Sequence, residues 1–390
     1  MDRAALGRVL LDLVGTETNP DLEPLTEHDW TALNRIAGLH RLEVLLHAMH
    51  QQSPAIPAEI AAQWFIAHRR GAMEVMVWQS ELAETFAKLE AAGYAPVALK
   101  GAWLAAYAYP EPVQRPLRDI DLLLPADQVL PAWRMLVEDG CVPIQHSKLS
   151  LEDHARLEQH MPPLTLPRGT VLELHSRISE LSGRLEYATP AGNEAELLAR
   201  AVTIDGIRYP EPTDMLAHLV IHAVYGHRLD CGPLLLSDVY FLIKRHPVDW
   251  ARFWQAANTG KWAAGAALVF ALVRAAHGAK AVPDDPAEPE PPSPDMLALA
   301  QDLLVQDYEA KTYARLAAAL ATGGFGYAWR RLTGRVAGGA ESTVLIDRKA
   351  EGGRIGWAVS RIGAMARDLA NPEVRAEARR LARFRRWLEP

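Results

Sequence analysis

Apolar residues in the first quarter of the chain recur at the spacing of helices that bury one face. This pattern runs from Arg3 to Leu89 and is typical of amphipathic helices. The stretch from Trp64 to Leu89 predicts one long helix, because Gly93 is the first natural stop beyond it. We therefore predict a helical amino-terminal region over residues 1–93. The side chains expected on the buried face of the long helix are Phe65, Val75, Val77, Leu82 and Phe86.

The pattern changes to short β-rich runs between residues 94 and 210. These runs are separated by helical segments and read APVAL, DIDLLLP, VPIQH, TVLELH and VTIDGIRY. The last run contains Asp205 and Gly206, a pair that suits the turn of a β-hairpin. We predict that residues 94–210 form a core of mixed α and β structure.

Helical patterns return after Pro212. Segments Asp214 to Val224 and Leu234 to Lys244 predict helices within a helical domain over residues 211–281. Residues 282–294 read VPDDPAEPEPPSP, and their proline and acid content predicts an extended linker or long loop. A helical carboxyl-terminal region is expected over residues 295–390. Arginines concentrate near its end, where they form either a solvated helix face or a contact for an anionic substrate or partner.

Composition places the chain among folded, multi-part proteins. It has 390 residues, of which 49% are hydrophobic and 23% charged, values within the globular range that argue against a disordered or fibrous protein. The fold class is expected to be α+β, with a small mixed-sheet core flanked by helical amino-terminal and carboxyl-terminal regions. Formal net charge is −7, so the chain lacks the overall basic field with which proteins bind long nucleic acids.

Two features favour a cytoplasmic protein without a membrane span. The amino terminus lacks the basic and small-residue pattern of a secretory signal. The most apolar stretch, Trp262 to Val273, is shorter than the roughly 20 residues that a spanning helix needs. The two cysteines, Cys141 and Cys231, are too few for a disulfide framework and have no zinc-binding spacing.

The strongest candidate for chemistry is the pair Asp119 and Asp121 in RDIDLLLP. Residues two apart on a strand point to the same face, so both carboxylates project together while Ile120 points away. Carboxylate oxygens suit Mg²⁺, whose coordination is completed by water and substrate phosphates. With a third acid nearby, the pair would form a two-metal site for phosphoryl or nucleotidyl transfer.

A candidate phosphate-binding turn precedes the two acids. The run VALKGAWLAAYAY predicts a buried strand, a turn at Lys100 and Gly101, and the start of a helix. Glycine allows a phosphate to approach the free amides at a helix amino terminus. Lys100 would add a positive charge, and Arg115 and Arg118 are further candidates for phosphate contact.

The third acid is expected in TVLELHSRIS. Glu173 and His175 share one strand face, while Leu172 and Leu174 face the core. Glu173 is a candidate for the third metal ligand or for a general base, unless a partner or a sheet edge explains it. His175 is open between a contact with the surroundings of Glu173, a contact with substrate and a structural role.

Together these motifs resemble the DNA polymerase beta-like nucleotidyltransferase superfamily. More narrowly, LKGAWLAAYAYPEPVQRPLRDIDLLLP is similar to an uncharacterised bacterial nucleotidyltransferase family that has Leu-Lys-Gly, a Tyr, an Arg and then Asp-x-Asp. The similarity continues through LELH and DMLAHLVIHAVYGHRLD to Asp238. It covers about half of the chain and implies a core of the polymerase-beta type.

The resemblance implies an enzyme that moves a nucleoside monophosphate from an NTP, such as ATP, to a hydroxyl or similar acceptor, releasing pyrophosphate. It implies two Mg²⁺ ions, with Mn²⁺ as the alternative, and an unidentified small-molecule, peptide or protein acceptor. Asp119, Asp121 and Glu173 match the acidic triad, and Gly101 matches the phosphate-loop glycine. The superfamily's Gly-Gly or Gly-Ser is replaced by Gly101-Ala102, so the turn supplies no serine hydroxyl. This departure favours a second hypothesis, an inactive protein of the same fold that binds a nucleotide or a partner protein. A phosphotransferase that uses the same metal site is a third hypothesis.

Helical spacing also places His218 and His222 on one face, one turn beyond Asp214. They are candidates to line a substrate site, to bind zinc or simply to pack, although Leu219 stands where a metalloprotease helix would carry its glutamate. Asp238 is a candidate to pair with this helix or to position an acceptor. The chain has no P-loop, dinucleotide fingerprint or nucleophile elbow.

Overall fold

The computed structural model describes residues 1–18, 20–144, 149–179, 190, 193–306 and 372–388. Its amino-terminal region consists of helices α1 (Arg3–Val14), α2 (Glu27–Leu39), α3 (Glu43–His50) and α4 (Ala58–Ala91). The α2 helix begins at a capping box, in which Thr26 and Asp29 satisfy each other's backbone amides. The long helix that the sequence predicts is therefore confirmed, and α4 extends beyond both of its expected ends.

The buried face of α4 differs from the predicted one in its first half. Leu82 and Phe86 are buried as expected, whereas Phe65 is 47% exposed. The neighbouring Trp64 takes the inward position, together with Ala67 and Gly71. The prediction for Phe65 was wrong because adjacent helical residues point about 100° apart, so only one of the two aromatic rings can face the core.

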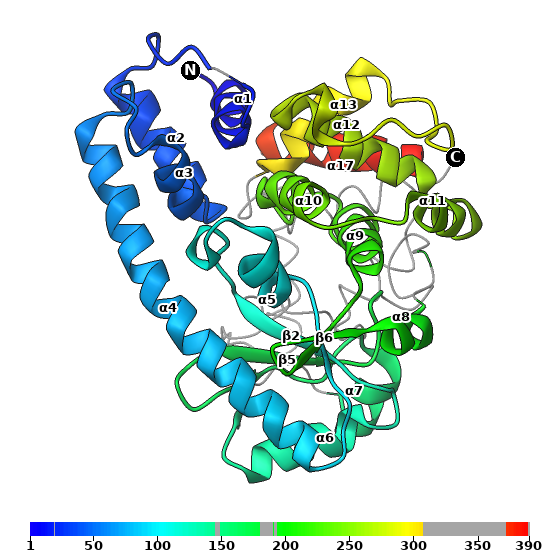
Figure 1. Cartoon of the computed structure of the whole chain (residues 1–390). Coiled ribbons are helices and arrows are strands. Elements are labelled where there is room, and N and C mark those ends of the chain that lie inside the picture. Colours follow the sequence, from blue (N-terminus) through cyan, green and yellow to red (C-terminus); the bar gives the residue numbers. More distant parts are fainter. Residues whose placement is uncertain (19, 145–148, 180–189, 191–192, 307–371, 389–390) are drawn as a thin grey trace, which may run out of the picture.

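A small mixed sheet lies at the side of α4 (Figure 1). Its strand order is β1-β2-β5-β4-β3, with β2 parallel to β5 and the other neighbouring pairs antiparallel. This sheet confirms the predicted α+β fold. The strands are β1 (Val97–Ala98), β2 (Asp119–Leu123), β3 (Val142–Pro143), β4 (Leu164–Thr165) and β5 (Val171–His175).

The connection from β2 to its parallel neighbour β5 is long, as parallel pairing requires. It carries α6 (Val129–Glu138), β3, α7 (Leu151–Leu157) and β4. After β5 come α8 (Glu194–Arg200) and a hairpin of β6 (Val202–Ile204) and β7 (Ile207–Tyr209). Asp205 and Gly206 both have positive φ, 51° and 81°, so they form the hairpin turn that the sequence predicts.

Later helices pack over the other side of the molecule from α6 and α7 (Figure 1). The described part of the predicted carboxyl-terminal region is residues 295–306 and 372–388, and the rest of that prediction lies outside the described residues. In α17, Arg383 and Arg380 contact Asp295 and Asp302 of α13. The elements are α9 (Pro212–Ile221), η3 (His222–Gly226), α10 (Leu234–Arg245), α11 (Trp250–Thr259), α12 (Ala263–His277), η4 (Ala279–Ala281), α13 (Pro294–Leu304) and α17 (Pro372–Leu388).

One continuous apolar cluster joins the amino-terminal helices, the sheet and the later helices. Ile120, Leu122, Leu172 and Leu174 are its contribution from the two central strands. Their burial fixes the opposite strand face as the one that carries the polar side chains. Among the described helices, none has the length and apolar character needed to cross a bilayer.

Candidate functional site

The polar face of β2 and β5 brings two acids together. In the parallel register Asp121 lies opposite Glu173, and Leu123 lies opposite His175. Side chains of paired residues on neighbouring strands project from the same face, so the carboxylates of Asp121 and Glu173 are neighbours. The sequence predicts which residues face this side, and the pairing of strands about 50 residues apart in sequence makes them one site.

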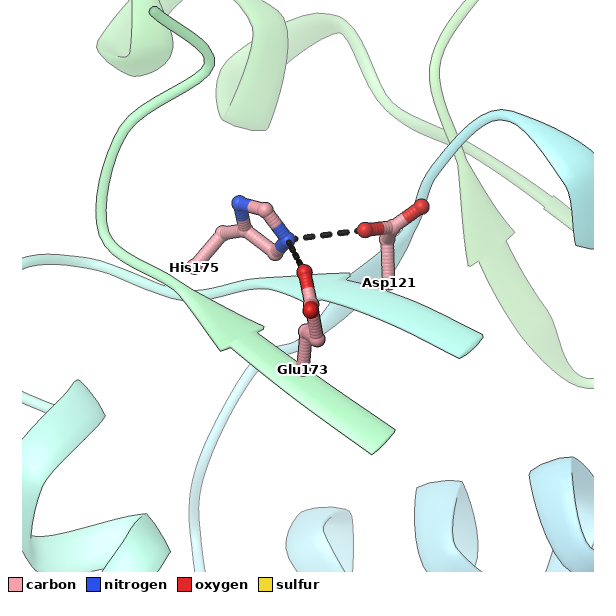
Figure 2. Close-up of side chains that lie close together, drawn as sticks. All are labelled: Asp121, Glu173 and His175. Carbon is pink, nitrogen blue, oxygen red and sulfur yellow. Dashed lines mark hydrogen bonds and ion pairs between the residues drawn. The ribbon is translucent and has the colours of Figure 1, made fainter. Parts of the chain in front are cut away.

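His175 lies between the two carboxylates (Figure 2). Its Nε2 atom is 2.8 Å from Oδ1 of Asp121 and 3.3 Å from Oε2 of Glu173. One oxygen of each acid and one ring nitrogen lie within 4.8 Å of one another, which is close enough for all three to bind one metal ion. A hydrogen bond to the surroundings of Glu173 was one of the roles expected for His175; in the structure its Nε2 atom contacts Glu173 itself and, more closely, Asp121.

Electrostatics in this cluster favour charged carboxylates and a charged imidazole. Burial would raise the pKa of Asp121, but the charge of Lys100 and the hydrogen bond from His175 outweigh it and hold this pKa well below its usual range. Burial also opposes ionisation of Glu173, yet the hydrogen bond from His175 lowers its pKa overall. For His175, burial lowers the pKa while hydrogen bonds to both acids raise it, to about 9.

Asp119 shares the face of Asp121 but lies at the start of β2. Its carboxylate is not part of the three-atom cluster formed by Asp121, Glu173 and His175. Burial, followed by repulsion from Asp121 and Glu173, raises its pKa to about 7. A nearby cation would relieve this repulsion, so Asp119 has the electrostatic environment expected of a metal-binding acid.

Lys100 approaches the acids from the turn between β1 and α5 (Gly101–Trp103). Its Nζ atom is 3.4 Å from Oδ1 of Asp121, and its backbone has φ 44° and ψ −112°. Such a backbone conformation costs a residue other than glycine about 1–3 kcal/mol, and strain of this kind concentrates at functional sites. The helix starts at Gly101 as predicted and continues into the π-helical turn η1 (Leu104–Ala108).

Arg115 forms a buried ion pair that the sequence did not reveal. Its Nε and Nη2 atoms donate to the two oxygens of Asp238 over 3.1 and 3.0 Å, and the Tyr109 hydroxyl donates to the same carboxylate over 2.8 Å. A Cβ atom on Gly101 would lie 2.4 Å from Nη1 of Arg115. Close approach of this arginine is therefore one reason for the glycine. Arg118 is exposed, and its charge acts on the pKa of His40.

His218 and His222 lie one turn apart, with ring centroids separated by 5.8 Å. His218 is buried, and neither of its ring nitrogens has a hydrogen-bond partner among the described residues. Burial and the charge of Lys100 lower its pKa far below the usual value, and Asp121 and His175 also act on it. The α9 helix thus presents a neutral imidazole near the acids.

His160 is a site residue that the sequence analysis missed. Its Nε2 atom is 3.7 Å from Oε2 of Glu173, and its backbone forms a β-bridge with His175. Its other ring nitrogen lies 2.7 Å from the carbonyl oxygen of Met161. A single histidine in an irregular segment carries no periodic signal, so only the tertiary contact identifies it.

The donor set fits a divalent cation. Asp121 and Glu173 supply hard oxygens, and His175 supplies a nitrogen that can bind a metal once it is neutral. The mixed sheet, the acids and the lysine-glycine turn therefore meet at one possible metal site. A family model described as an uncharacterised nucleotidyltransferase matches residues 26–278. The chain belongs to this uncharacterised nucleotidyltransferase family. A comparison with curated proteins found no match.

Proposed function

We propose that the chain transfers a nucleoside monophosphate from an NTP to a hydroxyl or similar group on a small molecule, peptide or protein. The observation that carries this proposal is the pairing of Asp121 with Glu173 on parallel strands inside the segment that matches the family. Asp119 on the same face would complete a triad of acids. Family membership supports the transferase class, and the acid pairing supports a metal-dependent form of it.

Asp119, Asp121 and Glu173 would hold two divalent ions, Mg²⁺ or Mn²⁺. Such ions supply charge stabilisation at the transferred phosphoryl group and lower the pKa of the attacking hydroxyl. The raised pKa of Asp119 supports its assignment, because this carboxyl gains most from a cation beside it.

The triphosphate would be held by the basic residues around the turn. Lys100 offers an ammonium beside Asp121. Two of the guanidinium nitrogens of Arg115 donate to Asp238, and its Nη1 atom beside Gly101 makes a long contact of 3.5 Å with the carbonyl oxygen of Pro116. Nη1 is therefore the guanidinium nitrogen proposed to contact a phosphate. Arg118 is exposed, at the end of the segment that leads into β2.

In the proposed reaction the acceptor oxygen forms a bond to the α-phosphorus of the NTP. The bond from that phosphorus to the bridging oxygen breaks, and pyrophosphate leaves. The proton of the acceptor passes to a carboxylate, for which Glu173 is the candidate. His218, His222 and Asp238 are proposed to line the acceptor side, where a neutral His218 can donate and accept hydrogen bonds.

Product mass tests the proposal. The protein is incubated with each NTP and with pools of small molecules, peptides and proteins, in Mg²⁺ or Mn²⁺. A mass increase equal to a nucleoside monophosphate minus one water, together with pyrophosphate release, is expected. Asp121→Asn and Glu173→Gln should each reduce the rate by at least about 100-fold. The exposed Asp127, just beyond β2, gives a matched control in Asp127→Asn, which should keep the full rate.

Two other outcomes would replace the proposal. An adduct with the mass of a single phosphate would identify a phosphotransferase that uses the same site. Tight NTP binding without any adduct across all acceptor pools would identify a binding protein of this fold. The missing serine after Gly101 makes this second outcome worth testing by calorimetry.

A further inference from the structure

The imidazole of His175 lies close to the carboxylates of Asp121 and Glu173. The distances from its Nε2 atom to their oxygens resemble the distances between neighbouring ligands of one metal ion. Nε2 of His175 is 2.8 Å from Oδ1 of Asp121 and 3.3 Å from Oε2 of Glu173. Two neighbouring ligands of an octahedral ion, each about 2.1 Å from the metal, lie about 3.0 Å apart. The two separations from the imidazole nitrogen therefore match those of neighbouring ligands on one ion, and all three donor atoms lie within 4.8 Å of one another.

The position of His175 is determined by the fold. It ends β5, it is 2% exposed, and its backbone bridges to His160. The fold consequently holds the Nε2 atom, which contacts both acids, at the cluster. This nitrogen would need no rearrangement to bind a metal ion.

We propose that His175 is a direct metal ligand through Nε2, with Asp121 and Glu173, and that this position takes a first-row transition-metal dication in preference to Mg²⁺. An imidazole nitrogen adds affinity for transition metals, whereas Mg²⁺ favours oxygen donors and retains its water. The position binds its ion without nucleotide, because all three donors come from the protein. This inference deepens the proposed function, but its test requires no turnover.

Mn²⁺ is the probe, because it has the lowest affinity for such sites among the first-row dications and is therefore the most demanding choice. Electron paramagnetic resonance of free Mn²⁺ gives the Kd for the full chain without nucleotide. Electron spin-echo envelope modulation of the bound ion reports a directly coordinated nitrogen. Competition with Mg²⁺ then gives the selectivity between the two ions.

We expect nitrogen modulation from the bound Mn²⁺, and we expect Mg²⁺ to compete only at concentrations at least about tenfold higher than those of Mn²⁺. His175→Gln should abolish the modulation and raise the Kd for Mn²⁺ by at least about 10–100-fold, the loss typical of removing even an outer-shell partner of a ligand. His160→Gln is the matched control, because His160 also lies near Glu173 but outside the three-atom cluster. It should retain the modulation.

Three results would overturn the inference: bound Mn²⁺ without nitrogen modulation, modulation that survives His175→Gln, or modulation lost only in His160→Gln. Failure to bind Mn²⁺ at all would overturn it as well. The wild-type measurement decides the question even if His175→Gln does not fold. Loss of nucleotidyl transfer alone leaves the inference standing, since metal binding is measured without substrate.

Discussion

The ion pair of Arg115 and Asp238 gives the sharpest prediction about stability. Asp238→Asn keeps the shape of the side chain but removes the charge that two guanidinium nitrogens contact. Both side chains are largely buried, with 17% of Arg115 and 5% of Asp238 exposed. Leaving such a charge without its partner costs about 3–5 kcal/mol. For a cooperative unit of about 250 residues, this corresponds to a loss of about 6–10 °C in Tm.

Thermal and urea unfolding, followed by circular dichroism, measure the effect. Arg115→Met and the double variant with Asp238→Asn complete a mutant cycle. The coupling energy should be about 1–3 kcal/mol, because the two groups are in direct contact. The exposed pair of Arg134 and Glu152 gives a control. Glu152→Gln should cost less than about 1 kcal/mol, since exposed ion pairs contribute little. A loss below 1 kcal/mol for Asp238→Asn would refute the reasoning and return Arg115 to a purely phosphate-binding role.

Three further predictions concern separate parts of the fold. Gly101→Ala should destabilise the protein by about 1–3 kcal/mol in urea unfolding, because Asp238 keeps Arg115 from moving away from the new methyl group; an unchanged midpoint would contradict this close approach. Glu81→Gln should cost about 1–3 kcal/mol, since the buried carboxylate accepts the backbone amides of Arg168 and Thr170, and retained stability would show that another acceptor replaces it. Burial and then the charge of Lys244 lower the pKa of His277 to about 4, so the folded protein resists a proton that the unfolded chain accepts below about pH 6.5. The stabilising contribution of neutral His277 is present above that pH and is lost as the pH falls towards 4. Between pH 7 and pH 5 the free energy of unfolding of the wild type should fall by about 2 kcal/mol more than that of His277→Gln. Equal losses would exclude His277 as a source of this pH dependence.

Local patterns were sufficient for most elements and for the acids. The helical periodicity predicted α4, and the Asp205-Gly206 pair predicted the hairpin of β6 and β7. Alternation along β2 placed Asp119 and Asp121 on one face of that strand. Alternation along β5 placed Glu173 on the face opposite its buried leucines. These predictions depend only on the period of a helix or strand, which is a property of neighbouring residues. The two-residue strand β4 was not among the predicted β-rich runs, whereas the equally short β1 and β3 lie within the runs APVAL and VPIQH.

What the sequence determined by itself is therefore the kind of element, the face on which each acid lies and the resemblance to a nucleotidyltransferase. Tertiary structure decided which distant residues meet. Register between β2 and β5 placed His175 beside Asp121, and helix packing placed Asp238 against Arg115, 123 positions away. Such contacts follow from the burial of a shared core and from strand pairing. Neither of these leaves a local period in the chain, so only the folded structure shows that His175 contacts Asp121 as well as Glu173.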